Sequence, residues 1–123
     1  MTLSLNRIIL FVQDVEQLKN FYQQHFALKT IEETAGEWVV FNAGNCQLAL
    51  HKAGAGFEIT RENQTNTKLV FETDEGLSQL RAKLMSDGVP MGELKSFKGL
   101  PYLFCDGTDP EGNVFQLMQK ITD

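Results

Sequence analysis

The stretch RIILFVQDVEQLKNFYQQHFAL, residues 7–28, joins a strand pattern to a helix pattern. Residues 5–12 form a strand-like, largely apolar run in which alternate side chains would point to opposite faces of a sheet. Asp14 then stands at an N-cap position, with Gln17 three residues later as its capping-box partner. Apolar side chains recur beyond it at helical spacing, at Val15, Leu18, Phe21, Tyr22 and Phe26. The stretch therefore predicts a strand followed by an amphipathic helix.

Three more strand candidates complete the first half of the chain. They cover residues 28–33, 37–42 and 46–52, and the turn-like segments Thr-Ala-Gly and Ala-Gly-Asn separate them. The order of elements is βαβββ. We therefore predict a first module at about residues 5–52.

The same order of signals recurs in the second half. An alternating run at residues 67–73 predicts a strand, and Asp74 is expected to cap a helix that Gly88 ends. Further strands are expected at 91–97, 100–105 and 114–119, the last one after the turn Asp-Pro-Glu-Gly-Asn. The segment Lys95 to Pro101 is expected to be a hairpin connection over the opening of a binding site. These elements predict a second βαβββ module at about residues 67–120.

The whole chain, residues 1–123, is predicted to form one α+β domain. Residues 53–66 are rich in glycine and then polar, as expected of a linker between the modules. Neither module could bury both faces of its sheet alone, so two half-domains that share one core are expected.

The composition excludes several classes of function. A formal charge of −5 with no basic run gives little attraction to nucleic acid or to an anionic membrane. The longest apolar run, residues 8–12, is too short to span a bilayer, and residues 1–4 lack a basic leader region. A cytoplasmic location is therefore expected. Cys46 and Cys105 lie far apart, which predicts buried free thiols and no disulfide framework.

The two modules, the opening stretch quoted above and the closing stretch DPEGNVFQLMQ resemble the vicinal oxygen chelate superfamily. That superfamily includes glyoxalase I, fosfomycin-resistance proteins, extradiol dioxygenases and bleomycin-resistance proteins. The resemblance covers nearly the whole chain and implies two curled sheets with helices on the convex side and a concave cleft. By strand alternation, Arg7, Ile9 and Phe11 would face the cleft, while Ile8, Leu10 and Val12 would meet the helix.

The resemblance also locates the positions where metal-dependent members hold a divalent ion. Counting from Asp14, Asp74 and Asp109 places these positions at the residues Arg7, Ala49, Lys68 and Gln116. Arginine and protonated lysine have no lone pair to donate, and a neutral amide cannot replace the charge of a carboxylate. His51, two residues beyond Ala49, is a single metal-ligand type, and one histidine makes no site. We therefore expect no bound metal and no other cofactor.

The cleft is instead predicted to bind a small anion or an aromatic carboxylate, as arginine and lysine donors on an apolar floor would favour. The residues expected to contact the ligand are Arg7, Phe11, Ala49, His51, Lys68, Glu72 and Gln116. Three alternatives apply to parts of this set. Arg7 and Lys68 extend from strand starts to water, or they pair with Glu72. His51 is a strand-end residue near solvent.

Three functions stay open at this point. The first is sequestration or sensing of a small molecule by a metal-free protein similar to the bleomycin-resistance branch, and a homodimer is implied. The second is a glyoxalase-like lyase or isomerase, or a dioxygenase, with an unusual site in which Glu72 or His51 would act as the base. The third is a dimerisation module with a vestigial cleft. No catalytic residue is assigned.

Overall fold

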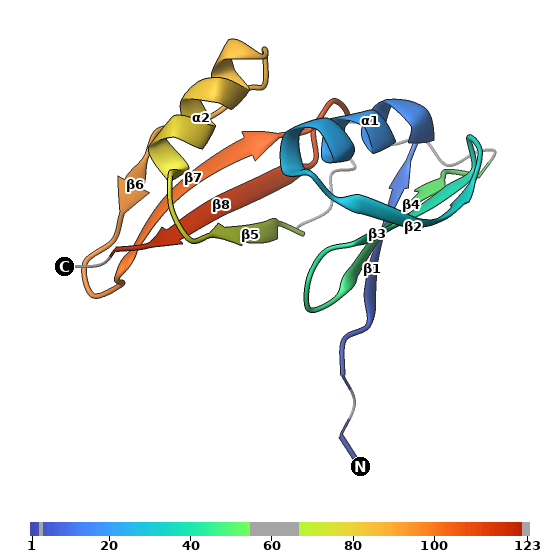
Figure 1. The fold of residues 1–123 in the computed structure, drawn as a ribbon, viewed down its shortest axis with the longest axis horizontal. Helices are drawn as coiled ribbons and strands as arrows, with labels where there is room; N and C mark the ends of the chain where they lie inside the picture. Colours follow the sequence, from blue (N-terminus) through green and yellow to red (C-terminus); the bar gives the residue numbers. More distant parts are fainter. Residues whose placement is uncertain (3, 55–66, 122–123) are drawn as a thin grey trace. The chain divides into compact units, whose positions relative to one another are not determined.

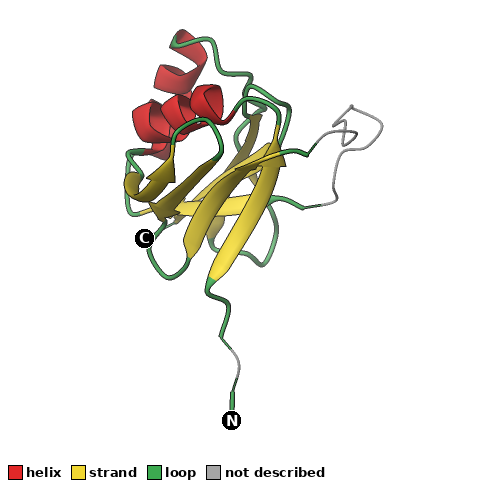
Figure 2. Cartoon of the chain, turned by 90° about the vertical axis from the view of Figure 1, so that its right-hand side faces the viewer, coloured by secondary structure: helices red, strands yellow, loops and turns green. Residues whose placement is uncertain are grey.

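The structure is a computed structural model that describes residues 1–2, 4–54 and 67–121. The chain divides into two compact units, Met1–Asn63 and Gln64–Asp123, each with one sheet and one helix on one face of that sheet (Figure 1, Figure 2). The first unit contains β1 (Arg7–Val12), α1 (Val15–Phe26), β2 (Lys29–Thr34), β3 (Trp38–Asn42) and β4 (Gln47–Lys52). The second contains β5 (Leu69–Thr73), α2 (Leu77–Ser86), β6 (Lys95–Ser96), β7 (Tyr102–Thr108) and β8 (Val114–Lys120). This element order confirms the predicted α+β fold of two βαβββ modules.

The two sheets have the same topology. The strand orders are β1-β4-β3-β2 and β5-β8-β7-β6, so in each unit the first strand pairs in parallel with the last one. The other neighbours are antiparallel. The register confirms the predicted alternation, because β1 and β4 pair Arg7 with Gln47, Ile9 with Ala49 and Phe11 with His51.

Helix α1 begins and packs as its sequence predicts. The Asp14 Oδ1 atom accepts a hydrogen bond of 3.0 Å from the backbone N–H of Gln17. The helix ends at Ala27, which adopts a left-handed conformation with φ 53°. Leu18 and Tyr22 are fully buried against the sheet, and burial of a side chain such as Leu18 contributes about 1.5–3 kcal/mol. The core of this unit also includes Val12, Val15, Val39, Val40, Phe41, Leu48 and Leu50.

Helix α2 corrects one prediction, because Asp74 is not its cap. The N-cap is Gly76, in a left-handed conformation with φ 74°, and it makes no side-chain capping bond. The backbone N–H of Leu77 donates instead to Oε1 of Gln119 at 2.8 Å. A side chain from β8 therefore replaces the local cap. Neither α1 nor α2, the two helices of the described residues, has the length and apolarity that crossing a bilayer requires.

The strands after α2 also differ from the prediction. The strand expected at 91–97 shortens to Lys95–Ser96, with one isolated bridge between Met91 and Gly107. The backbone N–H of Gly92 donates to the Asp106 carbonyl at 2.7 Å, so this segment keeps one bond to β7 without forming a regular ladder. In contrast, β7 continues to Thr108, three residues beyond its expected end. The hairpin predicted between Lys95 and Pro101 is confirmed as the β6–β7 connection.

The β7–β8 turn is held by a buried carboxylate. Asp109 is only 5% exposed, and its Oδ1 accepts from the backbone N–H of Glu111 at 3.0 Å and of Asn113 at 2.9 Å. The Asn113 Nδ2 atom donates to Oδ2 of the same carboxylate at 2.9 Å. These bonds fix the hairpin register in which Asp106 lies directly opposite Gln116.

Candidate functional site

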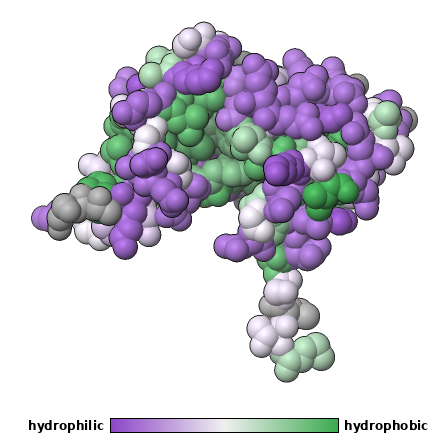
Figure 3. Space-filling view, viewed as in Figure 1, coloured by the Kyte–Doolittle hydropathy of each residue, from purple (hydrophilic) through white to green (hydrophobic). Residues whose placement is uncertain are grey.

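One face of the first unit's sheet gathers most of the ligand-contacting residues predicted in that unit. The β1, β3 and β4 registers put Arg7, Ile9, Phe11, Trp38, Gln47, Ala49 and His51 on this face, which we call the Arg7 face. Large apolar side chains remain at the surface there, with Phe11 49% exposed and Ile9 41% exposed. Apolar patches interrupt the otherwise hydrophilic surface of the chain (Figure 3). Exposed apolar area of this kind is typical of binding surfaces.

Arg7 is a cation with neutral partners. Its Nε and Nη2 atoms both donate to Oε1 of Gln47, at 2.9 and 2.7 Å. Its guanidinium carbon lies 5.5 Å from the centroid of the Trp38 ring, within the range of a cation–π contact. Within the described part of the chain, no carboxylate is paired with Arg7. The Trp38 Nε1 atom donates to Glu32 and so fixes the indole.

His51 completes an aromatic group beside Arg7. Its ring centroid lies 5.3 Å from that of Phe11 and 5.6 Å from that of Trp38. The imidazole is exposed, and its Nδ1 lies 2.7 Å from the carbonyl oxygen of Lys52. Because a carbonyl only accepts, the Nδ1 that faces it carries a proton. Ala49, also on this face, is fully buried and brings no polar group to it.

The second unit brings Lys68 and Gln116 together through a residue that the sequence analysis missed. The Asp106 carboxylate accepts from Lys68 Nζ at 3.0 Å through Oδ2 and from Gln116 Nε2 at 3.0 Å through Oδ1. The side chains of Lys68 and Asp106 are 43% and 46% exposed, so this ion pair contributes only about 0–1 kcal/mol of stability. The charge of Lys68 is nevertheless locally balanced. Glu72, predicted to be a partner of Lys68, lies exposed on the same sheet face opposite Met118.

A pocket of about 270 Å³ opens beside this group. Phe97 and Phe104 form one wall, with ring centroids 5.7 Å apart. Cys105 also lines the pocket but is buried, and burial raises the pKa of its thiol above the ordinary value of 9.0. Asp106 raises this pKa further and Arg81 partly opposes the shift. The thiol is therefore protonated at neutral pH and is no nucleophile.

The side chains do not fit the divalent metal that the superfamily implies. At the positions that correspond to ligands, Arg7 and Lys68 carry cations, and Gln116 presents an amide whose nitrogen is bonded to Asp106. Among the described residues, no three His, Cys, Asp or Glu side chains gather in a way that could hold an ion. The donor set of each unit is thus suited to anions or to hydrogen-bonding ligands, and we derive no reaction step through a metal.

Asp106 and Trp38 belong to these sites but were not predicted from the sequence. Asp106 follows the alternation of Tyr102 and Phe104, and only the early end assigned to that strand excluded it. The contact of Trp38 with Arg7 depends on the strand order β1-β4-β3. No local pattern specifies that order.

The comparisons with known proteins agree with this architecture. The family model described as Glyoxalase/Bleomycin resistance protein/Dioxygenase superfamily matches residues 4–117. The chain therefore belongs to this superfamily. Comparison with curated protein sequences gave no match.

Three solved structures illustrate how widely the fold is shared. TnmS3, an antibiotic binding protein from a Streptomyces species, has a TM-score of 0.77 at 21% identity and covers 98% of this chain and 98% of its own. The fosfomycin resistance protein FosX from Listeria monocytogenes has a TM-score of 0.77 at 17% identity and covers 97% and 94%. A lactoylglutathione lyase from Agrobacterium tumefaciens has a TM-score of 0.74 at 18% identity and covers 94% and 92%. At sequence identities of 17–21%, the similarity to these structures establishes the fold alone.

Proposed function

We propose that this chain is a small-molecule binding protein that recognises an anion with a flat apolar body and uses no metal. Arg7 would bind the anionic group, and Phe11, Trp38 and His51 would contact the apolar part. A carboxylate is the natural partner, because the planar guanidinium offers two parallel donors to its two oxygens.

The observation that carries the proposal is the environment of Arg7. Its guanidinium is held by the amide oxygen of Gln47 and the face of Trp38, and no described carboxylate neutralises it. These neutral contacts restrict the guanidinium before a ligand arrives, which lowers the ordering cost of binding. Lys68 differs, because Asp106 already balances its charge. We therefore assign anion recognition to Arg7 rather than to Lys68 or Gln116.

A binding role also agrees with the chemistry at the superfamily's metal-ligand positions. Positions occupied by Arg7, Ala49, Lys68 and Gln116 supply no strong electron-pair donors. An antibiotic binding protein, TnmS3, shares the fold, so binding is one role that this architecture carries. If protein purified without chelator retained stoichiometric zinc, nickel, manganese or iron, the metal-free part of the proposal would be wrong.

The test is a thermal denaturation series with benzoate, which combines a carboxylate with a flat apolar ring. Benzoate is expected to raise the melting temperature of the parent protein, since a ligand that binds only the folded state stabilises it. Arg7→Ala should abolish the rise. The matched control is Lys83→Ala, which removes one exposed positive charge from α2 and leaves the Arg7 face untouched. An equal rise in the Arg7→Ala protein would refute the proposal.

We further propose that the chain is a cytoplasmic homodimer, as the superfamily resemblance implies. Exposed apolar side chains outside the Arg7 face, such as Val70, Met85 and Leu100, supply surface that a second copy could bury. Analytical ultracentrifugation at high micromolar concentration should then give twice the subunit mass of 13.9 kDa. A sedimentation profile of single subunits would exclude the dimer without affecting the benzoate test.

A further inference from the structure

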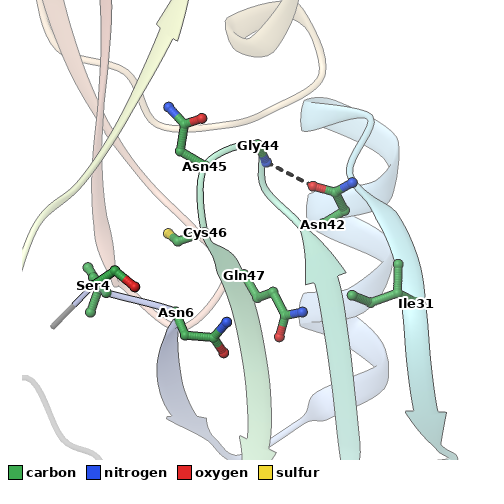
Figure 4. A pocket seen from close by; sticks show the side chains of 9 residues that line it. Ser4, Asn6, Ile31, Asn42, Gly44, Asn45, Cys46 and Gln47 are labelled. Carbon is green, nitrogen blue, oxygen red and sulfur yellow. Dashed lines mark hydrogen bonds between the residues drawn. The ribbon is translucent and has the colours of Figure 1, made fainter. Parts of the chain in front are cut away.

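A second pocket lies in the first unit, at the end of the sheet where β4 begins. It encloses about 390 Å³, a volume within the usual range for small-molecule sites. Its lining comes from five segments: the residues before β1, strand β2, the end of β3, the turn between β3 and β4, and the start of β4 (Figure 4). The pocket therefore depends only on the fold of this one unit.

The chemistry of the lining differs from that of the Arg7 face. Apart from the Cys46 thiol, no residue that lines the pocket has an ionisable side chain, and its polar side chains include Asn6, Asn42, Asn45 and Gln47. The lining itself supplies no countercharge to a charged ligand, and the guanidinium of Arg7 beside it is engaged by Gln47 Oε1. Each carboxamide offers both donors and an acceptor, and Ile31, which is 52% exposed, adds an apolar wall.

The carboxamides are partly fixed before any ligand binds. The backbone N–H of Gly44 donates to Asn42 Oδ1 at 3.0 Å, which holds that side chain. The backbone N–H of Gln47 donates to the backbone carbonyl of Asn6 at 2.8 Å, which holds the segment before β1 next to the start of β4. The Gln47 Oε1 atom accepts both bonds from Arg7, so the Nε2 group of the same amide is oriented as a donor. No described residue accepts a hydrogen bond from this Nε2. The pocket thus presents an ordered donor beside solvated amides.

We propose that this pocket binds a small neutral molecule that carries paired hydrogen-bond donors and acceptors, as in the vicinal hydroxyls of a sugar or in a carboxamide. The site is distinct from the anion site, because it requires no charge on its ligand. Gln47 is the one residue that connects the two.

Cys46 provides a direct reporter for occupancy. Its side chain lines the pocket and is partly exposed, whereas Cys105, the other cysteine of the chain, is buried. N-ethylmaleimide should therefore alkylate Cys46 much faster than Cys105, which intact-mass and peptide-mass measurements can verify. A molecule seated in the pocket would cover the thiol and slow its alkylation in proportion to occupancy.

The experiment compares three probes: glucose, nicotinamide and nicotinate. Glucose or nicotinamide is expected to slow alkylation of Cys46. Nicotinate, the charged isostere of nicotinamide, is expected to protect Cys46 less than nicotinamide does, because it lacks the amide donor and its carboxylate would bind at Arg7. Protection by glucose identifies hydroxyl recognition, and protection by nicotinamide identifies carboxamide recognition. Asn6→Ala and Asn45→Ala should each weaken the protection, while Asn20→Ala, an exposed position on α1, should preserve it.

Three results would overturn the inference. They are unchanged alkylation with both neutral probes, equal protection by nicotinate, or full protection in both pocket variants. Arg7 is intact throughout, and benzoate binding is measured by thermal denaturation, so a failure here leaves the anion proposal standing. The converse also holds, since loss of the benzoate effect says nothing about Cys46 protection.

Discussion

Gln47→Glu is the substitution that tests the anion site without removing any of its side chains. The Gln47 Oε1 atom lies 2.9 Å from Nε and 2.7 Å from Nη2 of Arg7. A carboxylate of nearly the same shape at this position would form a charge-assisted pair with the guanidinium. The new pair would satisfy Arg7 internally, so a ligand carboxylate would have to compete with it.

The expected loss follows from the worth of one charge-assisted contact. A hydrogen bond to a charged group contributes about 1.5–3 kcal/mol, and each 1.4 kcal/mol is about tenfold in affinity. Benzoate should therefore bind roughly 10 to 150 times more weakly to the Gln47→Glu protein. The free energy of unfolding without ligand should stay equal or rise by up to about 1 kcal/mol, because a partly exposed ion pair has been added.

Isothermal titration calorimetry with benzoate measures the affinity, and urea denaturation measures the stability. The matched control is Gln24→Glu, which adds the same negative charge at an exposed position of α1. It should change benzoate affinity little, because exposed charges at a distance are screened by salt. Benzoate affinity that is unchanged in Gln47→Glu, or reduced equally in both variants, would refute the assignment of Arg7 as the anion-binding group.

Three further predictions concern the second unit. Lys68→Ala should weaken benzoate binding, measured by calorimetry, far less than loss of the Arg7 guanidinium does, because the lysine is already ion-paired; an equal loss would contradict this. Gly107→Ala should lower the free energy of unfolding in urea by about 1–3 kcal/mol, because its new Cβ would lie 2.5 Å from the Met91 sulfur. The control Gly54→Ala should leave this free energy nearly unchanged, because the space around Gly54 is open. Burial raises the pKa of the Cys105 thiol in the folded state above its value in the unfolded chain, which is near 9.0. The folded state therefore keeps this proton more tightly, and the free energy of unfolding falls as the pH rises above 9.0. Cys105→Ala should therefore show a shallower fall in melting temperature at alkaline pH than the parent, and parallel curves would exclude the effect.

The sequence predicted those features of the fold that depend on a local pattern of side chains. Arg7, Ile9 and Phe11 lie on one face of β1 as the alternation predicts, because helix α1 buries the opposite face. The Asp14 cap was equally predictable, because its carboxylate accepts a hydrogen bond from the backbone N–H of Gln17, only three residues away. These features depend on residues that are close in the chain.

The failed predictions depend on residues that are distant in the chain. Asp74 looked like a cap, but the N–H of Leu77 is satisfied by Gln119, 42 residues away. Gln116 lines the pocket beside Lys68, which leaves its predicted ligand contact open, but the sequence did not show that its amide nitrogen donates to Asp106 across the hairpin. Pairing between distant strands decides which polar side chains already have a hydrogen-bond partner, and the sequence of a short segment does not show that pairing.

The central claim is that Arg7 binds an anion without a metal, and one titration tests it most directly. Protein treated with a strong chelator is titrated with benzoate in a calorimeter, next to the Arg7→Ala protein treated in the same way. The account predicts that the parent keeps its full affinity after chelation and that the variant loses it. Binding that disappears on chelation and returns with added zinc or manganese, or binding that persists in Arg7→Ala, would contradict the account.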